Sequence, residues 1–228
     1  MGLAAVLLLS AAWLPLQFNW PLRAESQGAT DENPLRTGIL WTCVLLGILY
    51  AFAEGTFSNW SVIYLTDDRG VAPATAAFAL SFFWAMLAVG RLLIAAILLR
   101  VPAVRVWLTL PVLMCGAFLM LPLVRTGSSG VAAFGFAGLS CSAFFPLTVG
   151  VVSGRFPTRT ALVSSLMTAG LTIGIGTGTF VIGSLRAAMP MERLYVSSAL
   201  YPALAFVITL ILVRSGRLQQ PVANVRSP

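Results

Sequence analysis

Four polar side chains recur at helical spacing within an otherwise apolar stretch of the sequence. At positions i, i+4, i+8 and i+11 of one helix face, these residues are Tyr50, Glu54, Ser58 and Ser61. Glu54 is the single charged residue among the 30 residues that separate Arg36 from Asp67. Keeping a carboxyl group inside a span of this length is expensive, and such groups usually serve transport or a proton relay. We therefore predict that Glu54 exchanges a proton inside a water-filled cavity.

Asn59 and Trp60 lie on faces that adjoin this polar stripe, and they add an amide group and an indole ring. Carboxylate, amide and hydroxyl groups bind hydroxyl-rich solutes through hydrogen bonds, while aromatic faces pack against their rings. The set therefore favours a sugar or a similar polyol as the ligand. The alternative for the serines is hydrogen bonding between helices, and the alternative for Trp60 is anchoring at the membrane interface.

Arg91 is a second charge within an apolar run, and it shares a helix face with Ser81 and Trp84 at i, i+3 and i+10. At a rise of 1.5 Å per residue, Glu54 and Arg91 are offset by ~11 Å along the membrane normal. This offset argues against an ion pair between the two. We expect Arg91 to have a gating or structural role, through the cytoplasmic interface, loop groups or helix carboxyl ends. Trp84 is a candidate for contact with the cavity.

Proline and glycine mark two further runs. Pro146 follows two phenylalanines inside an apolar run, which predicts a kink or break whose freed carbonyl groups can line a cavity. Gly170 and Gly174 lie one helical turn apart in the next run and predict close packing and bending of helices. A nucleotide-binding glycine loop is excluded there, because no strand precedes these glycines.

The elements that carry these residues are predicted to be membrane-spanning helices. Hydrophobic residues make up 58% of the 228 residues, charged residues make up 9%, and the mean hydropathy is +0.92. Runs long enough to span a bilayer cover residues 2–20, 38–65, 73–99, 106–124, 131–153, 161–184 and 195–213. The connectors between them are too short to hold a soluble domain. We predict an all-α polytopic membrane protein of about seven transmembrane helices, with the lipid bilayer as its surroundings.

Composition also excludes several function classes. All 14 basic residues are arginine and there is no histidine, so no imidazole site for a metal or for catalysis can form. The three cysteines are far apart within apolar runs and are expected to be packing residues. No basic cluster favours a nucleic-acid partner, and no lysine can hold retinal as a Schiff base. We therefore expect neither an enzyme nor a bound metal or other cofactor.

The arginines sort onto two faces when the runs are threaded through a membrane. One face takes nine of them and the other takes four, namely Arg69, Arg125, Arg186 and Arg193. Because arginine favours short cytoplasmic loops, the nine-arginine face and the carboxy terminus are predicted to be cytoplasmic, in a bacterial inner membrane. A secretory signal is the alternative for residues 2–20, although a basic amino-terminal flank and a small-x-small cleavage site before Gln17 are absent.

Three segments resemble a known family of carriers. YAFAEGTFSNWSVIYLTD, from Tyr50 to Asp67, resembles the seventh helix of major facilitator superfamily carriers of the fucose/glucose permease type. GRLLIAAILLRVPAVR, from Gly90 to Arg105, is similar to the Gly-Arg exit of the eighth helix, although the superfamily's full acidic loop motif is absent after Gly90. GLSCSAFFPLTVGVVSGRFP, from Gly138 to Pro157, is similar to the tenth helix with its mid-membrane Phe-Pro.

This resemblance implies a domain organisation. It divides the chain into the last helix of a missing amino-terminal half (1–20), a cytoplasmic linker (21–37), the six-helix carboxy-terminal half (38–218) and a cytoplasmic tail (219–228). The implied activity is secondary transport of a small solute by alternating access, with a sugar and a symported proton as the favoured case. A multidrug/proton antiporter of the same superfamily is one alternative. A truncated half-carrier that needs a partner half is the other.

Overall fold

The computed structural model describes residues 33–215, and over that range its secondary structure is helical throughout. Helical segments long and apolar enough to cross a membrane cover Gly38–Asp68, Pro73–Leu98, Ala103–Leu123, Gly127–Arg155, Pro157–Arg186 and Met191–Arg214. These six segments match the six runs predicted from residue 38 onward and indicate an integral membrane protein. The predicted first helix at 2–20, most of the linker and the tail lie outside the described residues, so the count of seven remains a prediction.

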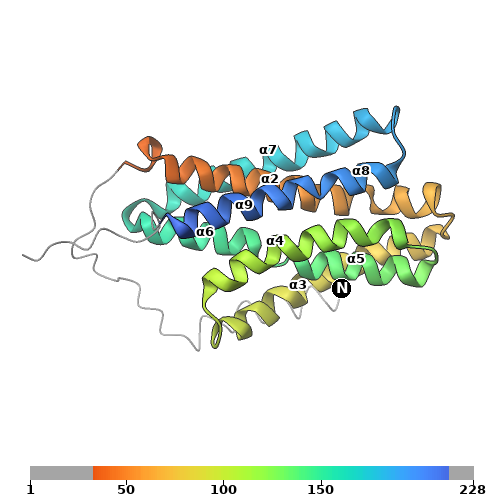
Figure 1. Ribbon diagram of the computed structural model, residues 1–228, viewed down its shortest axis with the longest axis horizontal. Coiled ribbons are helices and arrows are strands. Elements are labelled where there is room, and N and C mark those ends of the chain that lie inside the picture. The colour runs from red at the N-terminus through yellow and green to blue at the C-terminus, as the bar shows by residue number, and fades with distance from the viewer. Residues whose placement is uncertain (1–32, 216–228) are drawn as a thin grey trace, which may run out of the picture. The chain divides into compact units, whose positions relative to one another are not determined.

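Four of the six spans contain one long α-helix, with a short turn at one end in three of them. The long helices are labelled in Figure 1. These elements are α2 (Gly38–Ile63) with the π-helical turn η2 (Tyr64–Asp68), α3 (Pro73–Leu98), α4 (Ala103–Met120) with the 3-10 turn η3 (Leu121–Leu123), and the 3-10 turn η4 (Pro157–Arg159) with α7 (Thr160–Arg186). The remaining two spans are interrupted. They consist of α5 (Gly127–Cys141) with α6 (Phe144–Arg155), and α8 (Met191–Ser198) with α9 (Leu200–Arg214).

Local sequence explains several helix ends. Pro73 occupies the first position of α3, where its missing N–H costs no helical hydrogen bond. The Thr126 hydroxyl accepts the backbone N–H of Ser129, and the Ser129 hydroxyl accepts the N–H of Thr126, which closes a capping box at the start of α5. Gly70 has a φ of 63°, the left-handed conformation that turns the chain between η2 and α3.

Two glycine-lined contacts bring helices close together. Along α2 and α7, a Cβ atom placed on Gly174 would lie 2.6 Å from the Cβ of Ala51, and one on Gly170 would lie 3.0 Å from Val44. Along α3 and α5, a Cβ atom on Gly138 would clash with the backbone carbonyl oxygen of Phe83. Small residues thus allow the close backbone approach on which helix packing in membranes depends.

The helices differ in how much of their surface the rest of the bundle covers. Within the spans, 61% of the most apolar window of α2 is buried, against 17% for α3. Large apolar side chains such as Phe78, Trp84 and Leu92 are exposed on α3. The helix α2 is therefore central, and α3 offers a broad apolar face to lipid or to another protein segment.

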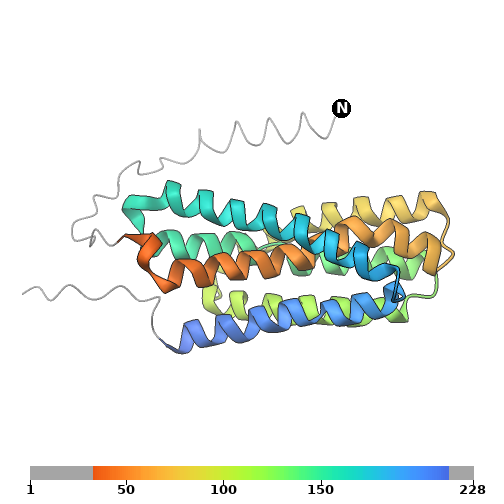
Figure 2. The same cartoon turned by 90° about the horizontal axis from the view of Figure 1, so that it is seen from above.

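The helix ends gather at two opposite ends of the bundle (Figures 1 and 2), and the described arginines other than Arg91 lie at one end or the other. At the end where α2 begins and α9 finishes lie Arg36, Arg100, Arg105, Arg155, Arg159 and Arg214. At the opposite end lie Arg69, Arg125, Arg186 and Arg193. The helix order therefore places the described arginines as the sequence pattern predicted.

At the end of the bundle that carries Arg69, a polar network joins the ends of four helices, and we call it the Arg69 network. Arg69 donates to the Tyr64 hydroxyl at 2.8 Å, to the Pro122 carbonyl at 3.2 Å and to the Glu192 carboxylate at 3.0 Å. Nearby, Arg186 pairs with Asp67 at 2.8 Å. The network ties η2 to η3, to the end of α7 and to the start of α8.

Candidate functional site at a broken helix

The span from Gly127 to Arg155 is broken near its middle by Pro146. The helix α5 ends at Cys141, residues Ser142 and Ala143 form a turn, and α6 begins at Phe144. Proline has no N–H, so the carbonyl of Ser142, four residues before Pro146, cannot receive the usual helical hydrogen bond. The break therefore leaves polar backbone groups at membrane depth, where water does not supply partners.

Two side chains from other helices supply the missing donors. The Tyr50 hydroxyl on α2 donates to the Cys141 carbonyl at 2.9 Å, and this bond is buried. Arg91 Nε on α3 donates to the Ser142 carbonyl at 3.2 Å. Both carbonyls at the break are thus hydrogen-bonded by side chains, which fixes the positions of Tyr50 and Arg91 relative to each other.

Gly90 explains how α3 comes close enough for the second of these bonds. A Cβ atom on Gly90 would collide with the Ser142 side chain, so a larger residue would push α3 away from the break. The Ser142 hydroxyl is buried against this glycine and has no hydrogen-bond partner among residues 33–215. The Gly-Arg pair therefore combines close approach at one position with a long cationic donor at the next.

Glu54 lies beside this break, one helical turn after Tyr50. Its side chain is buried, with the residue 8% exposed. The carboxyl lies within hydrogen-bonding reach of the Tyr50 hydroxyl and interacts electrostatically with Arg91 and with Cys141. Glu54 and Arg91 form no direct ion pair, as their predicted offset along the membrane normal implied. Their charges still interact across the apolar interior.

A pocket of about 220 Å³ opens between α3 and α6 at the break. It is lined by Arg91, Ile94, Ala95, Leu98, Ala143, Pro146 and Leu147. The helix α3 packs extensively along α5 and has little contact with α6, so the two helices separate after the break. Arg91 is the one polar side chain among the residues that line this pocket, and the remaining lining is apolar.

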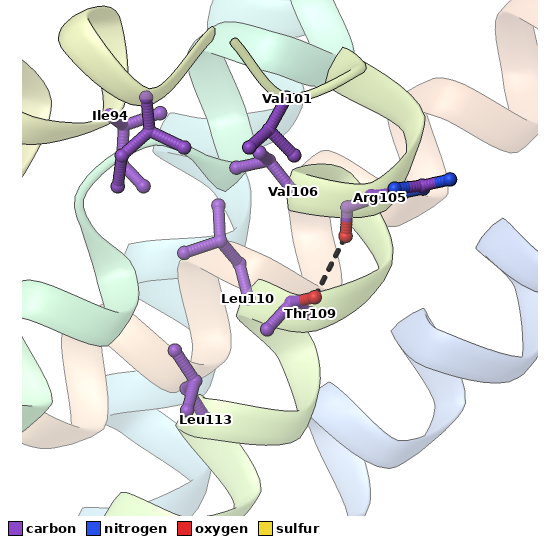
Figure 3. Close-up of a pocket in the computed structure, with 8 residues that line it drawn as sticks. Ile94, Val101, Arg105, Val106, Thr109, Leu110 and Leu113 are labelled. Atoms are coloured by element: carbon purple, nitrogen blue, oxygen red, sulfur yellow. Dashed lines mark hydrogen bonds between the residues drawn. The ribbon is translucent and has the colours of Figure 1, made fainter.

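A second pocket, of about 260 Å³, lies between α3 and α4, and its lining is likewise almost entirely apolar. In Figure 3 the Arg105 side chain points away from Ile94, Val106 and Leu110, which face the cavity. The Thr109 hydroxyl donates to the Arg105 carbonyl at 2.8 Å and is thereby occupied. This pocket therefore has an apolar interior into which no guanidinium is directed.

The remaining predicted site residues of α2 lie outside this constellation or bond within their own helix. The Ser58 hydroxyl donates to the Glu54 carbonyl at 2.9 Å, and Ser61 donates to the Ser58 carbonyl at 3.3 Å. Asn59 is exposed and donates to the Thr179 hydroxyl of α7 at 2.7 Å. The Trp60 N–H is buried and has no partner in the described part of the chain, and the Arg186 guanidinium lies 6.0 Å from the Trp60 ring centre.

Other candidates have packing contacts. Trp84 is 46% exposed and contacts Phe83 edge to face. Gly170 and Gly174 lie in the tight contact between α2 and α7. The structure thus brings Tyr50, Glu54, Arg91 and Pro146 together, and it places the other candidates along the helices that lead away from the break.

Sequence reasoning missed the backbone of Cys141 and Ser142, and it missed the role of Gly90. Cys141 was expected to be a small packing residue, whereas in the structure its carbonyl oxygen accepts the hydrogen bond from the Tyr50 hydroxyl. The signal for Ser142 was present, because a proline four residues later always removes the donor for that carbonyl. The identity of the replacement donors depended on tertiary contacts.

Models of known protein families show no match to this chain, and neither does a comparison with curated proteins.

Proposed function

We propose that this chain is the carboxy-terminal half of a secondary transporter of the major facilitator type, moving a small solute by alternating access with a proton exchanged at Glu54. The observation that carries the proposal is a buried carboxyl beside a helix broken at membrane depth. Intramembrane ionisable residues and discontinuous helices both mark the substrate and ion pathways of transporters. The resemblance of Tyr50–Asp67, Gly90–Arg105 and Gly138–Pro157 to carriers of this superfamily supports the same function.

Hydrogen-bond chemistry supports proton exchange at Glu54. The Tyr50 hydroxyl has one proton, and it is donated to the Cys141 carbonyl. A hydrogen bond between Tyr50 and Glu54 in this arrangement therefore needs a proton on the carboxyl. When Glu54 loses that proton, its carboxylate competes with the Cys141 carbonyl for the proton of the Tyr50 hydroxyl. Deprotonation would thus loosen the contact between α2 and the broken helix.

The substrate class has weaker support than the proton site. A sugar is the class that the sequence favours, and the exposed Asn59–Thr179 pair offers an amide and a hydroxyl for it. The serines of the polar stripe bond to their own helix, so they offer fewer free groups than the sequence pattern implied. A multidrug substrate is the alternative. Competition by sugars against competition by lipophilic cations in a transport assay separates the two.

A half-carrier architecture fits the exposed surfaces. Substrate sites in this superfamily lie between two halves, so the described bundle would form one wall of such a site. The poorly covered face of α3 is suited to packing against lipid or a missing amino-terminal half. We place the described bundle in a bacterial inner membrane, with the end that carries Arg100 and Arg155 in the cytoplasm, because short arginine-bearing loops favour that side.

The test uses the whole chain in liposomes and the variant Glu54→Gln. Infrared difference spectra across a pH titration should contain a carboxyl band that the variant lacks, and a pH gradient should drive solute uptake only with Glu54 present. Glu192→Gln is the matched control, because Glu192 lies in the Arg69 network away from the break. Full pH-driven uptake by Glu54→Gln would contradict proton coupling at this residue. A wild-type chain that shows the band without uptake favours the half-carrier that needs a partner.

A further inference from the structure

The pocket between α3 and α4 is an apolar groove that runs from the loop joining the two helices toward the middle of the bundle, and we call it the α3–α4 groove. Its volume is about 260 Å³. On α4, its lining includes Val106, Leu110 and Leu113, which recur at the spacing of one helix face. At the helical rise, these side chains follow α4 for ~10 Å. The two helices are adjacent in the chain but have few contacts with each other, so the groove between them stays open.

The surface around the groove is apolar as well. Leu99, just after the end of α3, is 86% exposed, and Val104 in the first turn of α4 is also exposed. Ile97 lines the groove and is exposed on its open side. In a membrane protein, such side chains face the hydrocarbon of the bilayer. An α-helix with its side chains is about 10 Å across and too wide for this space, whereas a single acyl chain is thin and apolar along its whole length.

The same end of the bundle carries arginines that the described part of the chain does not neutralise. Arg100 and Arg105 are exposed at the two ends of the α3–α4 loop and form no ion pair with the described residues. The described acids lie at mid-membrane or at the opposite end, namely Glu54, Asp67, Asp68 and Glu192. The other three acids of the chain belong to residues 25–32, outside the described part. At the opposite end, Arg69 and Arg186 each bind a carboxylate, at 3.0 and 2.8 Å. The groove therefore opens at the end of the bundle whose charge is complementary to an anion.

We propose that the α3–α4 groove binds an anionic phospholipid. One acyl chain lies along the apolar lining, and Arg100 and Arg105 bind the phosphate at the level of the loop. The Arg105 side chain points away from the apolar lining (Figure 3), so the acyl chain and the headgroup occupy different space. Arginine forms charge-assisted hydrogen bonds with phosphate, and basic pockets between transmembrane helices bind anionic headgroups. This inference depends on the membrane assignment and goes beyond the proposed transport function.

The test measures lipid binding to the full chain by native mass spectrometry from detergent micelles. Dioleoyl phosphatidylglycerol and dioleoyl phosphatidylcholine serve as probes, because they share their acyl chains and differ in net charge. We expect phosphatidylglycerol to bind roughly 25-fold more tightly, at about fivefold for each arginine. Inorganic phosphate should not displace it, because free phosphate has no chain to bury in the groove. Equal binding of the two lipids, or displacement by phosphate, overturns the proposal.

Charge variants test the headgroup contact. The double variant Arg100→Gln/Arg105→Gln should bind phosphatidylglycerol no more tightly than phosphatidylcholine. Arg125→Gln/Arg193→Gln is the matched control, because it removes two exposed arginines from the opposite end of the bundle. This control should retain the preference for phosphatidylglycerol. An equal loss in the two double variants would show that net charge, and not the site at the loop, determines binding.

A groove variant tests the acyl-chain contact while both arginines stay in place. Ile97→Trp puts a larger ring into the groove and should weaken phosphatidylglycerol binding by about tenfold, the effect of roughly two buried CH₂ groups. Leu92→Trp is the control, because Leu92 is exposed on α3 and does not line the groove. Unchanged binding by Ile97→Trp overturns the proposal. A lipid-free dimer that Ile97→Trp dissociates would place a second copy of the chain in the groove and would overturn it as well.

Discussion

The broken helix and the Arg69 network both hold an arginine next to a tyrosine and a helix-end carbonyl, but they use these groups differently. In the network, Arg69 reaches a hydroxyl, a carbonyl and a carboxylate, and Tyr64 donates to the Leu121 carbonyl at 2.7 Å. At the break, the two donors satisfy backbone carbonyls, while the Glu54 carboxyl and the ends of Arg91 remain available. The same side-chain types therefore connect helix ends in one region, whereas in the other they bind backbone carbonyls at a broken helix.

Burial is the physical reason for this difference. The carboxylates of the network are half exposed, with side-chain exposures of 58% for Asp67 and 50% for Glu192, so water shares in their solvation. Glu54 is 8% exposed and depends on protein partners for its solvation. An exposed ion pair contributes little to stability, whereas the state of a buried carboxyl changes the interactions of all its neighbours.

The largest expected effect on stability comes from Gly138→Ala, which tests the helix contact that holds Arg91 at the break. The added methyl group clashes with the Phe83 carbonyl, so α3 and α5 must separate, at a cost of about 2 to 3 kcal/mol. Unfolding in mixed micelles with rising SDS content measures the change. Gly150→Ala on α6 is the matched control, because a Cβ there meets nothing within 4 Å. Equal stability of the two variants would show that the close contact does not hold the site together.

A smaller effect is expected from Tyr50→Phe, which removes the donor to the Cys141 carbonyl. Because that carbonyl then lies buried at membrane depth without a partner, we expect a loss of about 1 to 2 kcal/mol. Tyr64→Phe makes the same chemical change in the Arg69 network, where it removes the donor to the Leu121 carbonyl. It should cost less, because this carbonyl lies at the end of the bundle, where water can replace the hydroxyl and Arg69 keeps Pro122 and Glu192 as acceptors. The same unfolding titration compares the two. A larger loss for Tyr64→Phe would reverse the contrast drawn between these regions.

The smallest effect is expected from Asp67→Asn, which removes the charge from the pair with Arg186. Since the Asp67 side chain is 58% exposed, we expect a change of about 0 to 1 kcal/mol. Added salt should narrow the difference from the wild type, because it screens exposed charges. Unfolding at low and high ionic strength measures both quantities. A loss as large as that of Gly138→Ala would mean that the network, and not the helix contacts, holds the bundle together.

Much of the fold could be predicted from hydropathy. The six described spans match the runs predicted from residue 38 onward, because about 20 apolar residues are needed to cross a bilayer and few other folds require them. The end at which each described arginine lies also follows from the order of the runs. Hydropathy could not show that α8 and α9 are separate helices, since the predicted run 195–213 crosses the boundary between them without a break in its apolar character.

The candidate site was only partly accessible to the same reasoning. The composition of the helix singled out Glu54, since one carboxyl within 30 apolar residues is conspicuous in any sequence. The polar stripe predicted a cavity less well, because the Ser58 and Ser61 hydroxyls donate to carbonyls of their own helix and need no cavity. Arg91 was expected to bind helix carboxyl ends, and it does donate to the Ser142 carbonyl at the end of α5.

The sequence by itself determined which segments are helices long enough to span a membrane, where one of them breaks and which acid lies within an apolar run. These properties follow from local chemistry: apolar length, the missing N–H of Pro146 and the cost of a charge away from water. Only the tertiary structure decided that Tyr50 and Arg91 complete the broken helix and that a pocket opens beside them. Those contacts join residues 51 and 91 positions apart, and they depend on how closely glycines let the helices approach.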